Sequence, residues 1–170
     1  LPKNLGTVIV KHANPCGVSI HKNNLKSYQL ALACDPISAF GGIVSCNFKI
    51  TKALALEFNN IFVEVIIANG FDAKALIILK KKKNLRLINA SNFSIKNFIG
   101  FNSANDTILT QSEDLKPFTI KDFIIVSKKK PNKYQLKNLI FAFNICRYVK
   151  SNAIVLAGHD ATVGIGSGQP

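Results

Sequence analysis

The sequence predicts an α/β fold, in which a layered, mixed and largely parallel sheet is flanked by helices. Short β-branched or aliphatic runs alternate along the chain with longer segments whose apolar residues recur at helical spacing. Hydrophobic residues make up 48% of the 170 residues and charged residues 18%, so the chain can bury a sizeable core. Strands that alternate with helices favour such layers, because each helix packs back onto the strands beside it.

The first half of the chain supplies most of the predicted strands. Thr51 and Asp72 are residue types that cap helix N-termini, and Asp35-Pro36 ends the first helix. Asn14-Pro15 and Gly17 are typical of a turn, so we expect the first strand to end before them. The predicted strands are 7–10, 43–46, 62–68 and 85–88, and the predicted helices are 25–34, 51–60 and one capped by Asp72.

The second half is less regular. Periodicity is weak from residue 89 to about residue 130, where 107–110 and 123–126 are short strand candidates. A long helix is then predicted over 132–149, where apolar residues keep helical spacing. Strands 153–156 and 162–165 follow, and the Gly158-His159-Asp160 turn between them predicts a hairpin.

The charge balance is strongly basic. Lys and Arg total 22 against 9 Asp and Glu, a formal net charge of +13, which excludes an acidic protein and permits anionic partners. Nearly all of the charge is lysine, however, whereas readers of bases and phosphates favour the planar guanidinium of arginine. The runs Lys80–Lys83 and Lys128–Lys130 lack interleaved aromatics, so we interpret them as solvated flanks of helices and expect no nucleic-acid partner.

Cysteine usage and hydropathy indicate a cytoplasmic protein. No apolar run reaches the ~18–20 residues that cross a bilayer, so we expect no membrane partner. The cysteines are widely spaced and form no disulfide framework, so we expect reduced thiols. These cysteines are Cys16, Cys34, Cys46 and Cys146.

The dipeptide Lys11-His12 is the strongest catalytic candidate. It lies where the first buried strand ends, and ligands of open α/β sheets bind at such ends. The ammonium of Lys11 can stabilise a developing oxyanion. The imidazole of His12 can move a proton near neutral pH, and the adjacent positive charge favours its neutral form. The alternative is a surface lysine beside a histidine that stabilises a turn.

Three further segments offer binding groups. Phe40 with Gly41 forms a loop in which a ring can stack on a ligand that approaches the bare backbone, or else an ordinary turn with a core phenylalanine. Glu64 interrupts an apolar strand, so it is a functional carboxylate unless it lies on the exposed face of an edge strand. Asn152 follows the long helix at its junction with a strand.

A zinc site is not expected. The segment from His12 to Cys16 is similar to part of the zinc deaminase signature, but Asn14 stands where that signature needs a glutamate. Cys16 also lacks a second cysteine three positions on, and a histidine with one cysteine does not make a zinc site.

Taken in order, several segments resemble the formyltransferase half of the bifunctional purine-biosynthesis family, AICAR transformylase/IMP cyclohydrolase. The similarity runs from about residue 7 to residue 169 and thins between 89 and 130. The matching blocks are VKHANPCG at 10–17, DPISAFGGI at 35–43, FVEVIIA at 62–68, KKKKNLRL at 80–87, VKSNAIV at 149–155 and GIGSGQ at 164–169.

The resemblance implies transfer of a formyl group from 10-formyltetrahydrofolate to the amine of AICAR, on a fold similar to cytidine deaminase. It makes His12 the proton acceptor and Lys11 the group that stabilises the transition state. It places Gly41, beside Phe40, and Glu64 in the AICAR site. It also implies that Asn152 contacts the substrate or the transferring formyl group.

The resemblance also bears on the extent of the protein. The family motif continues past Gly-Gln with Ser-Arg, whereas Pro170 follows Gln169 here. We therefore expect residues 1–170 to be the first subdomain of an AICAR transformylase domain, with the cyclohydrolase domain and the C-terminal part lying outside this sequence. Family active sites form across a homodimer, so we expect this piece to be inactive alone. Alternatives are a catalytically inactive nucleotide-binding module and a basic nucleic-acid binder.

Overall fold

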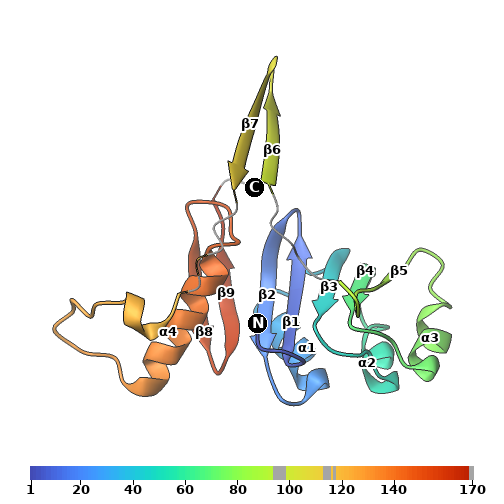
Figure 1. The fold of residues 1–170 in the computed structure, drawn as a ribbon. Helices are drawn as coiled ribbons and strands as arrows, with labels where there is room; N and C mark the ends of the chain where they lie inside the picture. Colours follow the sequence, from blue (N-terminus) through green and yellow to red (C-terminus); the bar gives the residue numbers. More distant parts are fainter. Residues whose placement is uncertain (94–98, 113–115, 117, 169–170) are drawn as a thin grey trace.

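The computed structural model describes residues 1–93, 99–112, 116 and 118–168 (Figure 1). Gln169 and Pro170, where the resemblance to the family departs, lie outside the described residues. A seven-stranded sheet has the order β5-β4-β3-β1-β2-β9-β8, and β6 and β7 form a separate hairpin. The strands of the main sheet are β1 (Gly6–Lys11), β2 (Asn14–Ile20), β3 (Gly42–Cys46), β4 (Val63–Ala68), β5 (Arg86–Asn89), β8 (Ile154–Gly158) and β9 (Ala161–Gly166).

The predicted α/β fold with a mixed, largely parallel sheet is confirmed. Pairs β3-β4 and β4-β5 are parallel, and the remaining four pairs are antiparallel. Five of the seven strands nevertheless run in one direction, because only β1 and β9 are reversed. The carboxyl end of β1 therefore meets the amino ends of β3 and β4 at one edge of the sheet.

Helices cover the two faces of the sheet unequally. The larger core joins three helices to one face through buried Tyr28, Leu54, Phe58, Ile66 and Leu79. A smaller core joins the last helix to the other face around β2, β8 and β9. The helices are α1 (Asn24–Cys34), α2 (Lys52–Glu57), α3 (Ala73–Leu79) and α4 (Lys133–Cys146).

Local signals account for most helix starts. The side chain of Thr51 accepts from the amide of Leu54, which confirms the predicted cap. Asn132 and Gln135 form a reciprocal capping box at the start of α4. Asp72 occupies the cap position of α3, but its side chain makes no capping hydrogen bond. α4 ends at Cys146, earlier than the predicted helix 132–149.

The predicted turn at Asn14–Gly17 is wrong. These residues lie in β2, and the turn is the dipeptide His12-Ala13, in which both residues have positive φ. Gly17 is a site of close approach, because a side chain there would collide with the backbone carbonyl of Ala31 in α1. Pro15 is tolerated beside a shift of register, where Ile9 pairs with Gly17 and Val10 pairs with Pro15.

The weakly periodic region contains one further correction. Residues 123–126 form no strand and follow the short 3₁₀ helix Ile120–Asp122, with Ile124 and Val126 87% and 92% exposed. The candidate at 107–110 is part of β7 (Thr107–Ser112), which pairs with β6 (Ile99–Ala104). Figure 1 shows this hairpin projecting from the sheet.

Within the described residues, no helix combines the length and the apolar content that crossing a bilayer demands.

Candidate functional site

Lys11 and the glycine loop meet at the edge where β1 ends and β3 begins. The Nζ atom of Lys11 donates to the carbonyl oxygen of Gly41 at 2.8 Å. The amide of Gly41 in turn donates to the carbonyl oxygen of Phe62 at 2.8 Å, which ties the loop to the start of β4. The contact directs the ammonium toward the glycine loop while leaving further N–H donors for a ligand.

Gly41 is held in a conformation that favours glycine. Its φ is +67°, in the left-handed region. A Cβ atom built on Gly41 would lie 2.9 Å from Nζ of Lys11 and 3.5 Å from the ring of Phe62. Any side chain here would displace the ammonium, so the glycine and the lysine depend on each other.

His12 occupies a hairpin turn of two residues. Its φ is +49° and that of Ala13 is +62°, the sign pattern of a type I′ turn. The side chain is exposed and has no hydrogen bond or ion pair with any residue that the structure describes. The imidazole is therefore available to a ligand at the edge where Lys11 lies.

Phe40 stands beside Phe62 at the same edge. Their ring centroids are 5.4 Å apart at an interplanar angle of 49°, and the side chains are 61% and 43% exposed. Both rings line a hollow of about 470 Å³ with Lys82 and Lys83, and neither Lys11 nor Glu64 lines it. Phe40 is thus an exposed ring and not the core residue of the alternative interpretation.

The loop before Phe40 is stabilised locally. The amide of Ser38 donates to Oδ1 of Asp35 at 2.9 Å. Hydrogen bonds from the side chain and backbone of Ser38 lower the pKa of the Asp35 carboxyl.

Lys82 lines the same hollow as Phe40. Burial lowers the pKa of Lys82, and its Nζ donates to the backbone carbonyls of Phe58 and Ile61. Lys82 therefore has a structural role.

Glu64 lies on β4 at a β-bulge. Gly42 pairs with Val63 and Ile43 pairs with Val65, so Glu64 is the extra residue opposite them. Bulges redirect a side chain, and they are common near active sites. Glu64 is half-buried, and its carboxylate makes no hydrogen bond or ion pair within the described ranges 1–93, 99–112, 116 and 118–168. The strand is internal, so the alternative of an edge strand does not apply.

Asn152 lies in the loop between α4 and β8. It is exposed, and its Oδ1 accepts from the hydroxyl of Ser151 at 3.0 Å. The loop is anchored through Lys150, whose amide donates to Oδ1 of Asn14 at 2.9 Å and whose carbonyl accepts from Gly168 at 2.9 Å. A shallow hollow of about 650 Å³ is lined by Lys150, Ser151, Asn152 and Gly168.

The structure thus brings some of the predicted site residues into direct contact and connects others only through neighbouring residues. Lys11 contacts Gly41, and Gly41 follows Phe40 at one edge. Glu64 is one strand further, and Asn152 reaches this edge through the bond between Lys150 and Asn14. Sequence reasoning assigned no role to Asn14 or Phe62, although both lie in motif blocks that carry the resemblance.

No metal centre is found among the described residues, where no cluster of three or more His, Cys, Asp or Glu side chains could hold an ion. Cys16 faces the core, and its Sγ donates to the carbonyl oxygen of Ile9 at 3.5 Å. Burial, followed by the nearby Asp35 carboxylate, raises the pKa of the Cys16 thiol to about 11. The thiol therefore stays protonated at neutral pH, which disfavours ligation of a metal ion.

These features define the class of the protein as an α/β domain that presents a Lys-His pair, a glycine loop and a bulged carboxylate at one edge of its sheet. The chain belongs to the AICARFT/IMPCHase bienzyme family, whose sequence model matches residues 2–170. The family that the motif blocks indicate is thereby confirmed.

Curated relatives of this chain carry the name bifunctional purine biosynthesis protein PurH. The relative from Rhodospirillum rubrum is 44% identical over 169 residues, covering 95% of this chain and 31% of that protein. The relative from Prochlorococcus marinus is 42% identical over 169 residues, covering 98% and 33%. The relative from Clostridium kluyveri is 43% identical over 162 residues, covering 95% and 32%. The chain spans about a third of the length of these relatives.

Proposed function

We propose that this chain is the first subdomain of an AICAR transformylase domain and takes part in purine biosynthesis as a phosphoribosylaminoimidazolecarboxamide formyltransferase. The observation that carries the proposal is the contact of Lys11 with Gly41 directly beside His12, whose imidazole has no partner among the described residues. A cation and a proton acceptor at one edge suit acyl transfer to an amine.

The reaction places two demands on the site. The amine nitrogen of AICAR attacks the formyl carbon of 10-formyltetrahydrofolate, a new C–N bond forms, and the bond from that carbon to N10 of the folate breaks. The amine is aromatic and weakly nucleophilic, so its proton must leave as the tetrahedral intermediate forms. N10 gains a proton as tetrahydrofolate departs.

His12 and Lys11 meet these demands in the proposal. His12 accepts the amine proton through an exposed imidazole that no described residue engages. The Lys11 ammonium donates to the oxyanion of the intermediate through an N–H that Gly41 does not use. Phe40 and Gly41 contact AICAR, Glu64 accepts a hydrogen bond from it, and Asn152 contacts the substrate or the transferring formyl group.

The extent of the chain shapes the rest of the proposal. The chain spans about a third of its relatives' length, and the family resemblance implies an active site that forms across a homodimer. We therefore expect the 170-residue chain alone to be inactive, and the complete protein to be a cytoplasmic homodimer that also carries the cyclohydrolase.

The test compares two histidines in similar turns, His12 and His159. In the complete gene product, His12→Ala should lower kcat for formyl transfer about 10²–10⁴-fold, the usual contribution of a general base, with AICAR affinity retained. His159→Ala should leave kcat unchanged, because His159 lies in the other hairpin turn. Equal loss in both variants, or none in His12→Ala, contradicts the assignment.

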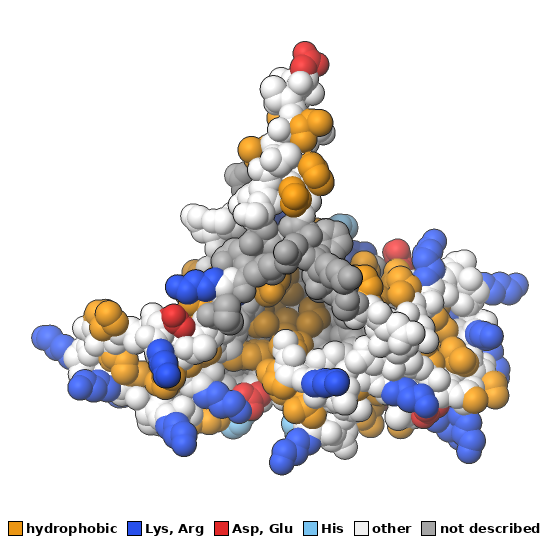
Figure 2. Space-filling view, in the orientation of Figure 1, with side chains coloured by type: hydrophobic (Ala, Val, Ile, Leu, Met, Phe, Trp, Pro, Cys, Tyr) orange, Lys and Arg blue, Asp and Glu red, His pale blue; other side chains and the backbone are white. Residues whose placement is uncertain are grey.

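Two other outcomes separate the alternatives. AICAR binding without turnover in the unaltered complete protein would favour an inactive nucleotide-binding module. Binding to nucleic acid that weakens steeply with salt and ignores His12 would favour a basic binder. Figure 2 disfavours the latter, since the Lys and Arg side chains are scattered over the face that it shows.

A further inference from the structure

We propose that Asn14 is a positioning residue, which holds the loop bearing Asn152 against the hairpin bearing Lys11 and His12. The inference rests on the proposed function for its kinetic consequences, whereas its structural part stands on the geometry alone.

Asn14 lies at the point where the two segments meet. It pairs with Lys11 across the β1-β2 hairpin, so the pair flanks the turn His12-Ala13. Its Oδ1 atom accepts the amide hydrogen of Lys150 at 2.9 Å, across 136 residues of sequence. One side chain thus links the end of β1 to a residue two positions before Asn152.

The loop is held through a single peptide segment. The amide of Lys150 is bound by Asn14, and its carbonyl oxygen accepts from the amide of Gly168 at 2.9 Å. Gly168 leaves no space for a side chain, because a Cβ atom there would collide with the backbone of Ser151. Gly168 packs the loop against the end of the β8-β9 hairpin, while Asn14 connects it to β1-β2.

The sheet itself does not supply this connection. β2 and β9 pair only at Ser19 and Ala161, among the described residues, and their other bonds join 18–20 to 160–162. Asn14 lies five residues before Ser19, or about 16 Å along an extended strand. Near the His12-Ala13 turn, the bond from Lys150 to Asn14 therefore takes the place of strand pairing.

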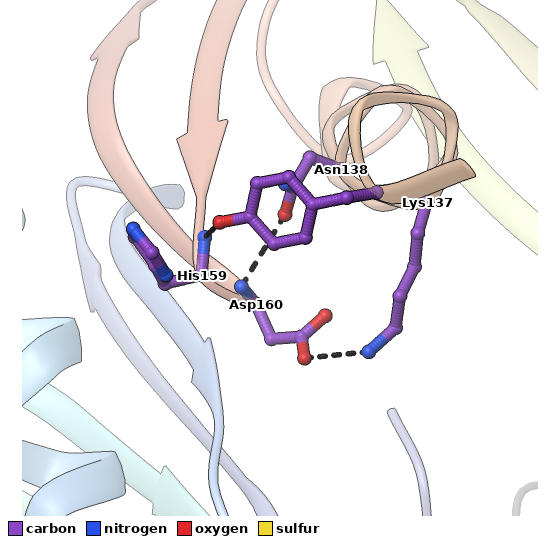
Figure 3. Close-up of polar contacts among 5 residues, drawn as sticks. Lys137, Asn138, His159 and Asp160 are labelled. Carbon is purple, nitrogen blue, oxygen red and sulfur yellow. Dashed lines mark hydrogen bonds and ion pairs between the residues drawn. The ribbon is translucent and has the colours of Figure 1, made fainter. Parts of the chain in front are cut away.

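The opposite end of the β8-β9 hairpin is secured in a different way. The amide of His159 donates to the hydroxyl of Tyr134 at 2.9 Å, and Lys137 pairs with Asp160 at 2.6 Å. Figure 3 shows these contacts reaching from α4 to the turn, with the amide of Asp160 directed at Asn138. This end of the hairpin is held without Asn14. Tyr134→Phe therefore serves as a matched control, because it removes a hydrogen bond of the same length from the other end.

The first measurement is amide hydrogen exchange in the complete gene product, read on peptides that span 147–153 and 156–161. Asn14→Ala should raise the exchange rate of the Lys150 amide at least about tenfold and leave His159 unchanged. Tyr134→Phe should give the reverse pattern. Asn14→Asp should restore protection of Lys150, because a carboxylate oxygen accepts the same hydrogen.

The second measurement is steady-state kinetics of formyl transfer. Asn14→Ala should lower kcat about 10–100-fold with little change in the KM for AICAR, since a small misplacement of a contacting group costs this much. Asn14→Asp should recover most of kcat, and Tyr134→Phe should match the unaltered protein. Asn14→Ser, with a side chain shorter by one atom, serves if the alanine variant unfolds.

Each outcome decides the proposal. An unchanged exchange rate of the Lys150 amide in Asn14→Ala would overturn the proposed link between Asn14 and the loop. A faster exchange rate with an unchanged kcat would overturn the positioning role. Absence of turnover in the unaltered complete protein would instead overturn the proposed function. The exchange rates would still test the link between Asn14 and the loop.

Discussion

Two hairpin turns in this molecule share a backbone and differ in their surroundings. The turn between β1 and β2 is His12-Ala13, and the turn between β8 and β9 is His159-Asp160. All four residues have positive φ, between 49° and 62°. Each turn begins with an exposed histidine.

The difference lies in what holds each turn. Side chains of α4 bind both amides of the second turn and the carboxylate of Asp160. In the first turn, no side chain among the described residues binds the amide of His12 or Ala13, although each left-handed residue costs ~1–2 kcal/mol. The imidazole of His12 also has no hydrogen-bond or ion-pair partner there. A strained turn with a free imidazole next to Lys11 suggests function, whereas a strained turn held by a helix suggests structure.

Removing the cation beside each turn should give the largest contrast. Lys11→Ala should lower kcat about 10²–10³-fold in the complete protein, because it removes the group that we propose donates to the oxyanion. Lys137→Ala removes the partner of Asp160 at the second turn and should leave kcat unchanged. Steady-state formyl transfer measures both, and similar rates for the two variants would remove the functional distinction between the turns.

Substituting the glycine near each turn sharpens the comparison. Gly41→Ala should destabilise the protein by about 1–2 kcal/mol, because φ is +67° there, and should lower kcat by displacing the Lys11 ammonium. Gly158→Ala is the control, because a Cβ at Gly158 would meet nothing within 4 Å. Urea denaturation gives the free energies of unfolding, and an unaltered kcat in Gly41→Ala would separate the loop from the reaction.

Weakening the second turn should cost stability without activity. Tyr134→Phe removes the acceptor for the His159 amide, and we expect a loss of about 0.5–1.5 kcal/mol of unfolding free energy. Thermal and urea unfolding measure this loss. A fall in kcat under conditions where the variant stays folded would show that the second turn also serves the site.

A further expected effect is a dependence of stability on alkaline pH, which arises from two buried thiols in β2 and β3. Burial raises the pKa of Cys16 to about 11 and that of Cys46 to about 12, from an ordinary 9.0. The folded protein therefore keeps protons that the unfolded chain releases above pH 9.0, so stability is full below that pH and falls as pH rises toward these values.

Urea denaturation at a series of pH values from about 8 to about 10.5 tests this effect. Cys16→Ala should reduce the slope of unfolding free energy against pH. A slope that is absent in the unaltered chain would show that these thiols are more accessible than the structure places them.

Much of the fold could be predicted from the sequence, because helix caps and turns depend on residues close together in the chain. Thr51 caps α2 through an amide three residues away, and Gly158-His159-Asp160 marks the hairpin that joins β8 to β9. The candidate site residues Lys11 and Gly41 could also be predicted, because Lys11 ends a strand and Gly41 belongs to a glycine pair. Their motif blocks are what made the family visible without coordinates.

The remaining features depended on partners distant in the chain. Asn14–Gly17 has the composition of a turn, yet these residues pair with β1 as a strand, and Gly17 is needed there because α1 packs closely over it. Apolar 123–126 has the composition of a strand, yet an extended run needs a neighbour to pair with, and the described residues supply none.

The sequence alone determined the alternation of strands and helices, the family, and the residue types available for chemistry, because these depend on near neighbours and on ordered motifs. Only the tertiary structure decided that Lys11 donates to Gly41 and that Asn14 binds the loop of Asn152. Each of these contacts joins residues 30 or 136 positions apart, and a distance through space is set by the packing of the whole sheet.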